Sequence, residues 1–191
     1  MNERVTAKAG RATYQDVLDA PEHMVAELID GALHLQPRPA FPHARAASML
    51  TIEVGGPFDR GRGGPGGWWI VVEPELHFGD DVLVPDIAGW RRERLPAFPT
   101  GPWLELAPDW VCEVLSPSTR RIDLTDKREI YGEAGVGHLW LVDPIDRTLE
   151  IFARRDGAWV LVAALADEAE VKAPPFEAVG FPLSALWIEA S

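Results

Sequence analysis

The feature of this chain that most constrains its fold is a series of short apolar segments separated by turn residues. Asp30-Gly31 lies between two such segments and is a strong β-hairpin signal, which predicts strands over 25–29 and 32–36. The same criteria predict strands over 68–78, 82–90, 109–115, 138–143, 148–154 and 158–166. The chain is therefore expected to fold around β-sheet.

Three other stretches have helical character. Residues 13–20 form a predicted helix with Thr13 as its N-cap and Asp16 as the acid of a capping box. Residues 41–58 are compatible with a helix until Gly55-Gly56-Pro57 breaks it. A third helix is predicted over 123–134, followed by Gly135. Because helices lie before and among the strands, we predict a mixed α/β (α+β) domain.

The length of 191 residues fits one domain, for which we expect a tail over 1–12 and a single folded unit over 13–191. The lone cysteine, Cys112, excludes an intrachain disulfide. The first fifteen residues contain no apolar core of a signal peptide, and the longest apolar run, 158–166, is too short to span a membrane. These features predict a cytoplasmic protein with no membrane partner.

The formal net charge is −12, from 18 basic and 30 acidic residues. This charge disfavours non-specific nucleic-acid binding, because phosphates are repelled by most of the surface. It leaves room for a local cationic path. Candidate groups for such a path are Arg91-Arg92-x-Arg94, Arg120-Arg121 and Lys127-Arg128.

Several common site motifs are absent from the sequence. One cysteine and five scattered histidines provide no zinc-binding spacing. The glycine-rich stretch 60–67 lacks the Lys-Ser/Thr ending of a phosphate-binding loop, and no GxSxG nucleophile motif occurs. These absences direct attention to the acidic residues.

Two acids, Asp86 and Glu113, lie inside segments that are otherwise apolar. Burial of a carboxylate is costly unless it is paired, hydrogen-bonded or bound to a cation. The two-residue period of a strand places Glu113 on the same face as Val111 and Leu115, which is unlike a solvated face. For either acid alone, an exposed edge position or a structural ion pair remains the alternative.

Lys127 is the basic residue that we consider as a partner of these acids. It shares a helical stripe with Asp123 and Tyr131, and its side chain is expected to lean toward the preceding strand and Glu113. A surface pair with Asp123 is an equally good alternative. Two carboxylates with a lysine suit phosphodiester hydrolysis, in which acids hold Mg²⁺ and the lysine orients water, accepts its proton or neutralises developing charge.

The remaining motifs follow one another in a fixed order. They are Glu27-Leu-Ile-Asp-Gly31, His43 opening a helix, Val84-Pro-Asp86, Val111-Cys-Glu-Val-Leu-Ser-Pro-Ser-Thr119, Asp123-x-x-x-Lys127-x-x-x-Tyr131, Ala134-Gly-Val136 and Leu139-Trp-Leu-Val-Asp-Pro144. This series resembles the Uma-two family of putative restriction endonucleases, a branch of the PD-(D/E)XK nuclease superfamily. The resemblance extends over about residues 13–187.

The resemblance implies a restriction-endonuclease-like core, in which a central mixed β-sheet is flanked by helices. Asp86 matches the acid of the PD element and Glu113 the central acid, so both are implied ligands of Mg²⁺ or Mn²⁺. The lysine normally found two residues after the central acid is replaced by Leu115. Lys127 matches a lysine that has moved to the next helix, and Glu27 matches an additional acid near the N-terminus.

The function that these expectations favour is a Mg²⁺-dependent endonuclease that cleaves nucleic acid, with DNA preferred, through metal-activated water. Two alternatives stay open: a non-catalytic nuclease-fold module for binding or assembly, and a metal-dependent hydrolase of a small phosphorylated molecule. The sequence also leaves open a homodimer, and whether Glu73 or His43 joins the site.

Overall fold

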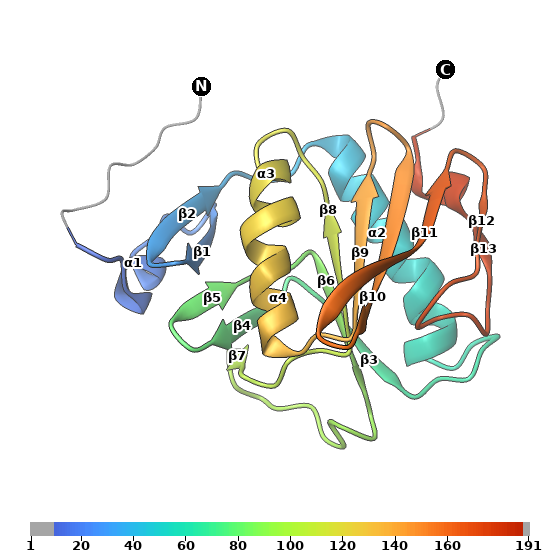
Figure 1. Cartoon of the computed structure of the whole chain (residues 1–191), viewed down its shortest axis with the longest axis horizontal. Coiled ribbons are helices and arrows are strands. Elements are labelled where there is room, and N and C mark those ends of the chain that lie inside the picture. The colour runs from blue at the N-terminus through green and yellow to red at the C-terminus, as the bar shows by residue number, and fades with distance from the viewer. Residues whose placement is uncertain (1–9, 189–191) are drawn as a thin grey trace.

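The strands of the computed structural model, which describes residues 10–188, form two mixed sheets and one small sheet (Figure 1). The strand orders are β2-β1-β5-β4-β7, β11-β10-β9-β8-β6-β3 and β12-β13. A few helices accompany the sheets, so the predicted mixed α/β class is confirmed. Most of the predicted tail over 1–12 lies outside the described residues.

The five-stranded sheet contains the predicted hairpin. Its strands are β1 (Val25–Ile29), β2 (Ala32–Gln36), β4 (Glu75–Phe78), β5 (Asp81–Leu83) and β7 (Trp103–Leu104). Asp30 and Gly31 have φ values of 51° and 75°, the left-handed conformation that a tight hairpin turn requires. Strand β1 pairs with β5 as well as with β2, so the hairpin is anchored to the domain.

The six-stranded sheet forms the centre of the molecule. Its strands are β3 (Trp68–Val72), β6 (Ile87–Arg91), β8 (Trp110–Val114), β9 (His138–Asp143), β10 (Thr148–Arg155) and β11 (Ala158–Ala166). All neighbours are antiparallel except β8 and β9. A parallel pair needs a crossover connection, which the helical segment 120–134 supplies. Strands β12 (Glu170–Val171) and β13 (Phe181–Pro182) form the small sheet.

Two of the predicted strands were wrong in extent, because each is divided near a proline. The segment 68–78 divides at Pro74, and the segment 82–90 divides at Pro85. Proline has no N–H group to donate and is excluded from central strand positions. The chain therefore leaves the six-stranded sheet after β3, forms β4 and β5, and returns at β6. Asp86 lies in the second break, immediately before β6, rather than inside a strand.

The helices differ from prediction at their ends. They are α1 (Tyr14–Leu18), α2 (Phe41–Val54) continued by a π-helical turn over Gly55–Asp59, α3 (Arg120–Ile122) continued through a π-helical turn over Asp123–Lys127 into α4 (Arg128–Ala134), and a final short 3₁₀ turn over Leu183–Leu186. The α-helix ends at Val54, directly before Gly55-Gly56-Pro57 as predicted, and the chain continues in a π-helical turn rather than leaving the helical path. The predicted third helix begins earlier, at Arg120.

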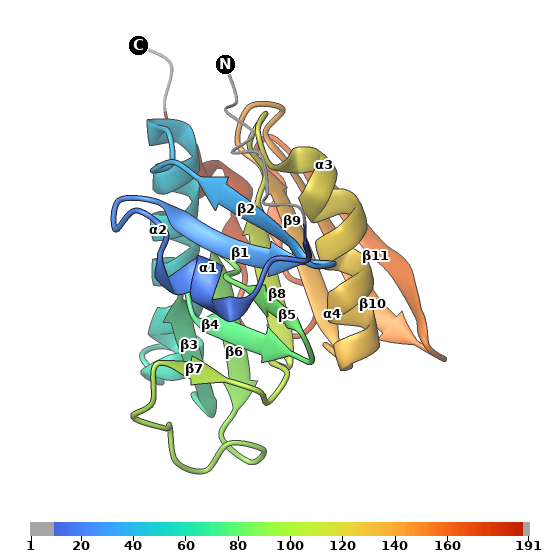
Figure 2. The same ribbon diagram turned by 90° about the vertical axis from the view of Figure 1, so that its left-hand side faces the viewer.

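Two hydrophobic cores lie on opposite faces of the six-stranded sheet, one under α2 and one under α4 (Figure 2). Along β8, Cys112 belongs to the core under α2, whereas Val111 and Leu115 belong to the core under α4. The second core also contains residues of the five-stranded sheet, such as Ile29 and Leu83. The six-stranded sheet, the five-stranded sheet and the helical segment with α4 therefore meet on this side of β8. No helix within residues 10–188 is long and apolar enough to cross a membrane.

Candidate active site

The pairing of β6 with β8 brings Asp86 and Glu113 together. Ala88 pairs with Val111 and Ile87 with Cys112, so one further step in the same register places Asp86 opposite Glu113. Asp86 Oδ2 also accepts a hydrogen bond of 2.7 Å from the backbone N–H of Val114. The side chain of Glu113 faces α4 with Val111 and Leu115, as its position in the sequence predicts.

The helical segment above β8 supplies the lysine. Its π-helical turn over Asp123–Lys127 is wider than an α turn, a feature that is frequent at functional sites. Lys127 is buried, and its Nζ lies 2.8 Å from Glu113 Oε1, 3.0 Å from Glu27 Oε1 and 3.6 Å from Asp123 Oδ1. One ammonium group thus contacts three carboxylates from three different elements.

Glu27 links both sheets to the helix. It is fully buried on β1, where Oε2 accepts a hydrogen bond of 2.6 Å from Gln36 Nε2. Its Oε1 accepts one of 2.7 Å from the N–H of Val84, in the break before β6. With Lys127 as the third partner, Glu27 holds the five-stranded sheet against the site.

Glu113 accepts two hydrogen bonds at one oxygen, because the hydroxyl of Tyr131 also donates to Oε1 at 2.6 Å. Burial raises the pKa of Glu113 well above its usual value, and the Lys127 ammonium only partly opposes this shift. Burial and the Glu113 charge raise the pKa of Tyr131 well above its usual value, so the phenol remains a neutral donor.

The charge of Lys127 is fixed by its partners. Burial alone lowers the pKa of this amine, but Glu113 and Glu27 raise it well above its usual value. Burial also raises the pKa of Asp123, despite the nearby ammonium. The cluster contains four carboxyl groups, those of Glu27, Asp86, Glu113 and Asp123, and one basic amine. Its ionised form therefore carries an excess of negative charge, which favours a further cation.

The open side of the site lies at Asp86. His43 Nε2, in the first turn of α2, lies 3.3 Å from Asp86 Oδ1, and these two side chains are 14% and 18% exposed. Burial opposes the imidazolium form, but the hydrogen bond and charge of Asp86 raise the pKa of His43. Its Nδ1 is buried and has no hydrogen-bond partner among residues 10–188. His43 thus joins the site, whereas the side chain of Glu73 is exposed.

Comparisons with known proteins identify the family and the fold. The model of the Uma-two family, described as "putative restriction endonuclease", matches residues 12–185. The chain belongs to this family. A solved structure, that of a putative nuclease from Anabaena variabilis, is similar to this Uma-two protein with a TM-score of 0.73 and 24% sequence identity. The alignment covers 91% of this chain and 96% of that one, which confirms the fold. No curated protein sequence matches significantly.

Several site residues of this Uma-two protein were not selected from the sequence. The alternative of a surface pair between Asp123 and Lys127 was wrong, because both side chains are buried. Tyr131 lies on the same helical stripe, so the spacing of four residues was a usable signal for it. Gln36 contacts Glu27 across the predicted hairpin, whereas His43 had no local signal because its partner Asp86 is distant in sequence.

The predicted cationic groups are divided between the two ends of the sheet. Arg92 pairs with Asp59, and Arg94 pairs with Asp109, at the end of β6 opposite to Asp86. Arg128 lies over the ring of Phe152, 4.3 Å from its centroid. Among these groups, Lys127 is in the cluster and Arg120-Arg121 begins the helix that carries it.

The donor set determines which metal the site could hold. Within residues 10–188, no group of three or more His, Cys, Asp or Glu side chains is arranged to hold a metal ion. A closed protein cage such as a structural zinc site therefore does not fit. Mg²⁺ is usually bound by one or two carboxylates and retains several waters, and Asp86 with Glu113 matches that chemistry.

Proposed function

We propose that this Uma-two protein is a metal-dependent endonuclease that hydrolyses phosphodiester bonds of nucleic acid, with DNA as the preferred substrate. The observation that carries the proposal is the buried contact of Glu113 with Lys127, opposite the partly exposed Asp86. Excess carboxylates around a single ammonium favour the binding of a divalent cation. Membership of a family described as "putative restriction endonuclease" supports the same conclusion.

Each residue has a distinct role in this proposal. Asp86 and Glu113 hold Mg²⁺ or Mn²⁺, which supplies Lewis acidity to the phosphate and lowers the pKa of a bound water. Lys127 neutralises charge that develops on the phosphate, because its raised pKa makes it a poor proton acceptor. Glu27 and Tyr131 position the lysine and Glu113. His43 orients the carboxylate of Asp86 from the open side.

The proposal is tested with purified protein on single- and double-stranded DNA and RNA, with Mg²⁺ or Mn²⁺ at low salt. Glu113→Gln keeps the shape of the side chain and removes its charge, so cleavage should fall by orders of magnitude. Glu129→Gln, the same change at an exposed position of α4, should retain wild-type cleavage. Equal activity of the Glu113→Gln variant and the wild type would contradict the proposed role.

Substitutions of Lys127 distinguish an electrostatic role of this lysine from a role in proton transfer. Lys127→Arg keeps a positive charge that cannot be given up, whereas Lys127→Ala removes it. We expect the arginine variant to retain more activity than the alanine variant, while metal binding persists in both. An arginine variant as inactive as alanine, with an unchanged melting temperature, would argue against the electrostatic role.

A second candidate is a nuclease-fold module that binds a partner without catalysis. The net charge of −12, together with the lack of a preformed metal cluster within residues 10–188, favours it. It becomes the better conclusion if the wild type cleaves none of the four nucleic acids with either metal. Phosphate esters of small alcohols, assayed in parallel, test hydrolysis of a small phosphorylated substrate.

A further inference from the structure

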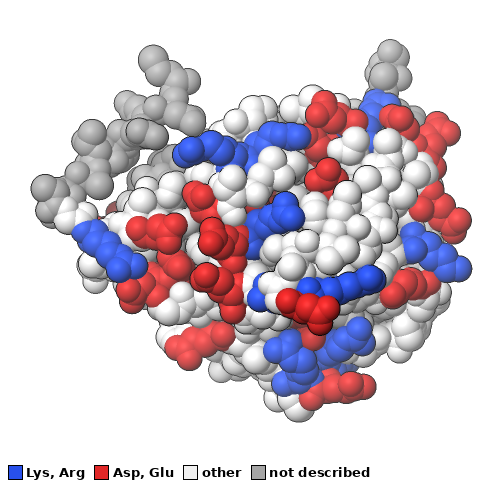
Figure 3. All heavy atoms as spheres, viewed as in Figure 1, with Lys and Arg blue, Asp and Glu red and all other residues white. Residues whose placement is uncertain are grey.

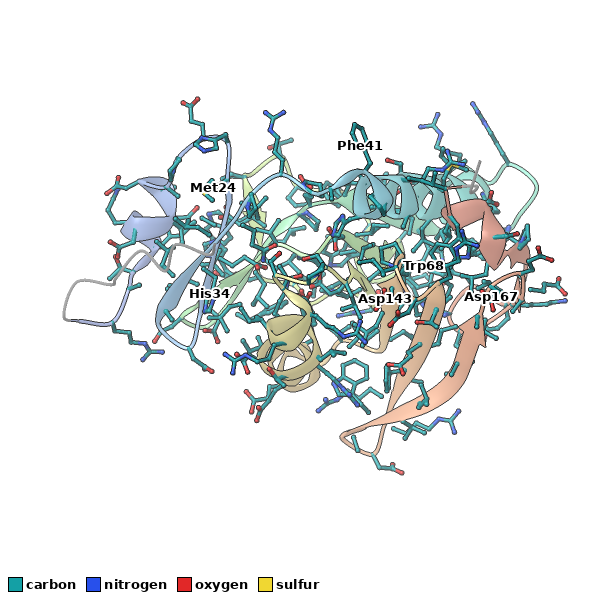
Figure 4. The ribbon with its side chains drawn as sticks, turned by 90° about the horizontal axis from the view of Figure 1, so that it is seen from above. Met24, His34, Phe41, Trp68, Asp143 and Asp167 are labelled. Atoms are coloured by element: carbon teal, nitrogen blue, oxygen red, sulfur yellow. The ribbon has the colours of Figure 1, made fainter. Side chains whose placement is uncertain are left out.

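A small pocket with mainly apolar side chains lies between the start of α2, the β9–β10 turn and residues 187–188. It has a volume of about 210 Å³ and is lined by Pro42, Pro144, Ile145, Arg147, Trp187 and Ile188. This volume is below the roughly 300–1,000 Å³ of pockets that take drug-sized ligands, so it suits a single small ring system. Seen from above, Phe41 marks the start of α2 and Asp143 the end of β9, the two elements that border the pocket (Figure 4).

The pocket is connected to the site through consecutive residues. Pro42 directly precedes His43, which faces Asp86. Pro144 directly follows Asp143, which pairs with Arg120 at the start of the site helix. Neighbouring Cα atoms are about 3.8 Å apart, so on α2 the pocket begins one residue from the open side of the site.

The outer wall of the pocket is held in place by hydrogen bonds. Asp143 Oδ1 accepts bonds of 3.0 Å from the backbone N–H groups of Ile145 and Asp146, and its other oxygen pairs with Arg120. Ile145 is nevertheless 65% exposed. The turn thus presents an apolar side chain to solvent in a defined position, where it contributes little to the core.

Basic side chains surround this end of the molecule. Four exposed arginines lie on the loop before α2, on α2, on α3 and on the β9–β10 turn, namely Arg38, Arg45, Arg121 and Arg147. Elsewhere arginines pair with acids, as Arg92 does with Asp59. In the view of Figure 3, basic side chains gather at the level of α3, and acidic ones predominate to the left and below it. The phosphates of a nucleic-acid strand are therefore attracted to the arginines around α3 and the start of α2, and repelled by these acidic side chains.

We propose that this pocket binds one unpaired base of the strand whose phosphate reaches Asp86 and Glu113, so that the substrate is single-stranded or locally unpaired. The inference rests on the proposed nuclease function. A base within a duplex must leave the stack before it can enter a pocket. Apolar and aromatic walls contact any base face, which makes such binding tolerant of sequence. A narrow strand also needs fewer basic contacts than a duplex, which suits an acidic protein.

Binding is measured in the Glu113→Gln background, which prevents cleavage, by fluorescence anisotropy of a labelled, unstructured DNA strand with Mg²⁺ at low salt. Ile145→Asp should weaken binding by about tenfold, because one base contact contributes roughly 1–3 kcal/mol. Ile52→Asp is the matched control, since Ile52 on α2 is 61% exposed against 65% for Ile145 and the charge change is identical. The control should bind as tightly as the background protein.

A second measurement locates the base. An abasic residue moved along the strand should weaken binding by about tenfold at one position only, and Ile145→Asp should remove that positional effect. Equal binding by the two aspartate variants, or duplex bound as tightly as the single strand, would overturn the inference. So would a change of molar mass in light scattering caused by Ile145→Asp, because it would identify a second copy as the occupant. Failure of the proposed function differs from these results, since the wild type would then cleave nothing.

Discussion

The two faces of β8 are equally buried but chemically opposite. Cys112 and Glu113 are consecutive residues with exposures of 0% and 2%. The Cys112 face meets an aromatic core, in which the rings of Trp110 and Trp140 pack edge to face at 5.5 Å. The Glu113 face meets Lys127 and further carboxylates. Because side chains alternate along a strand, the five residues of β8 contribute to the apolar core on one face and to the candidate site on the other.

These faces differ in what they contribute to stability. Each large apolar side chain buried under α2 contributes roughly 1.5–3 kcal/mol. A buried ion pair loses several kcal/mol per ion in desolvation, which the attraction between partners approximately offsets. The charged face is therefore expected to be a weak stabiliser. The comparison teaches that burial alone does not distinguish a core from a site.

The largest expected effect is the removal of the Lys127 ammonium. Lys127→Met keeps apolar volume but leaves three carboxylates without their cation, so we expect a loss of about 3–5 kcal/mol at neutral pH. The pKa values of Glu113 and Asp123, already raised by burial, should rise further. When the folded state raises the pKa of an acid, the protein loses stability as pH increases. The stability difference between the variant and the wild type should therefore shrink toward pH 4–5 (about the usual carboxyl range). Urea unfolding across pH measures it.

The double variant Lys127→Met with Glu113→Gln sharpens this test. Removal of one carboxylate should recover part of the lost stability at neutral pH, because the repulsion is reduced. No recovery would mean that the loss arises from packing rather than charge. In that case the charged face would contribute to stability through packing, as the apolar face does.

On the apolar face, a small polar change should cost less. Cys112→Ser places a hydroxyl among aromatic rings without a designed partner, which we expect to cost about 1–3 kcal/mol. Glu113→Gln, one residue away, should leave stability unchanged or slightly improved. Thermal unfolding of both variants makes the comparison directly. Equal losses would show that the two faces respond alike.

Metal should stabilise the protein through the charged face and not through the apolar one. At a tenfold excess over Kd, Mg²⁺ or Mn²⁺ should add about 1.4 kcal/mol of stability, or a few degrees in Tm. Asp86→Ala should abolish this gain, whereas Cys112→Ser should retain it. Calorimetric melts with and without metal provide the measurement. An unchanged Tm of the wild type would count against metal binding.

The smallest effect is expected at the pair formed by the buried Asp143 and the half-exposed Arg120. Burial tends to raise the pKa of Asp143, but the hydrogen bonds from Asp146, Arg120 and Ile145 lower it below 3.8. An acid with a lowered pKa adds stability above its usual value and loses it as pH falls. Asp143→Asn should therefore cost about 1 kcal/mol or less at neutral pH, and the cost should be smaller at pH 3 (about one unit below the usual value). Stability curves at both pH values check the sign.

Much of the local structure was predictable from the sequence. Asp30-Gly31 predicted a hairpin with the observed bounds, since this turn requires those residue types. The Thr13–Asp16 capping box is formed, with a 2.8 Å hydrogen bond from the Thr13 N–H to Asp16. The predicted strands 68–78 and 82–90 included Pro74 and Pro85, although the chain passes from one sheet to the other at these residues. Local propensity did not show which sheet each half joins, because pairing partners are distant in sequence.

The sequence by itself determined which residues could not be ordinary core: Asp86 and Glu113 stand in apolar segments, and this pattern depends only on strand periodicity and the cost of burying charge. The tertiary structure alone decided their surroundings. Asp123 became a buried partner of Lys127, Tyr131 became a donor to Glu113, and Glu27 joined the helix to the second sheet. The helical spacing brings Asp123, Lys127 and Tyr131 onto one stripe, but their burial against Glu113 and Glu27 depends on the packing of sheets and helix, which no local pattern encodes.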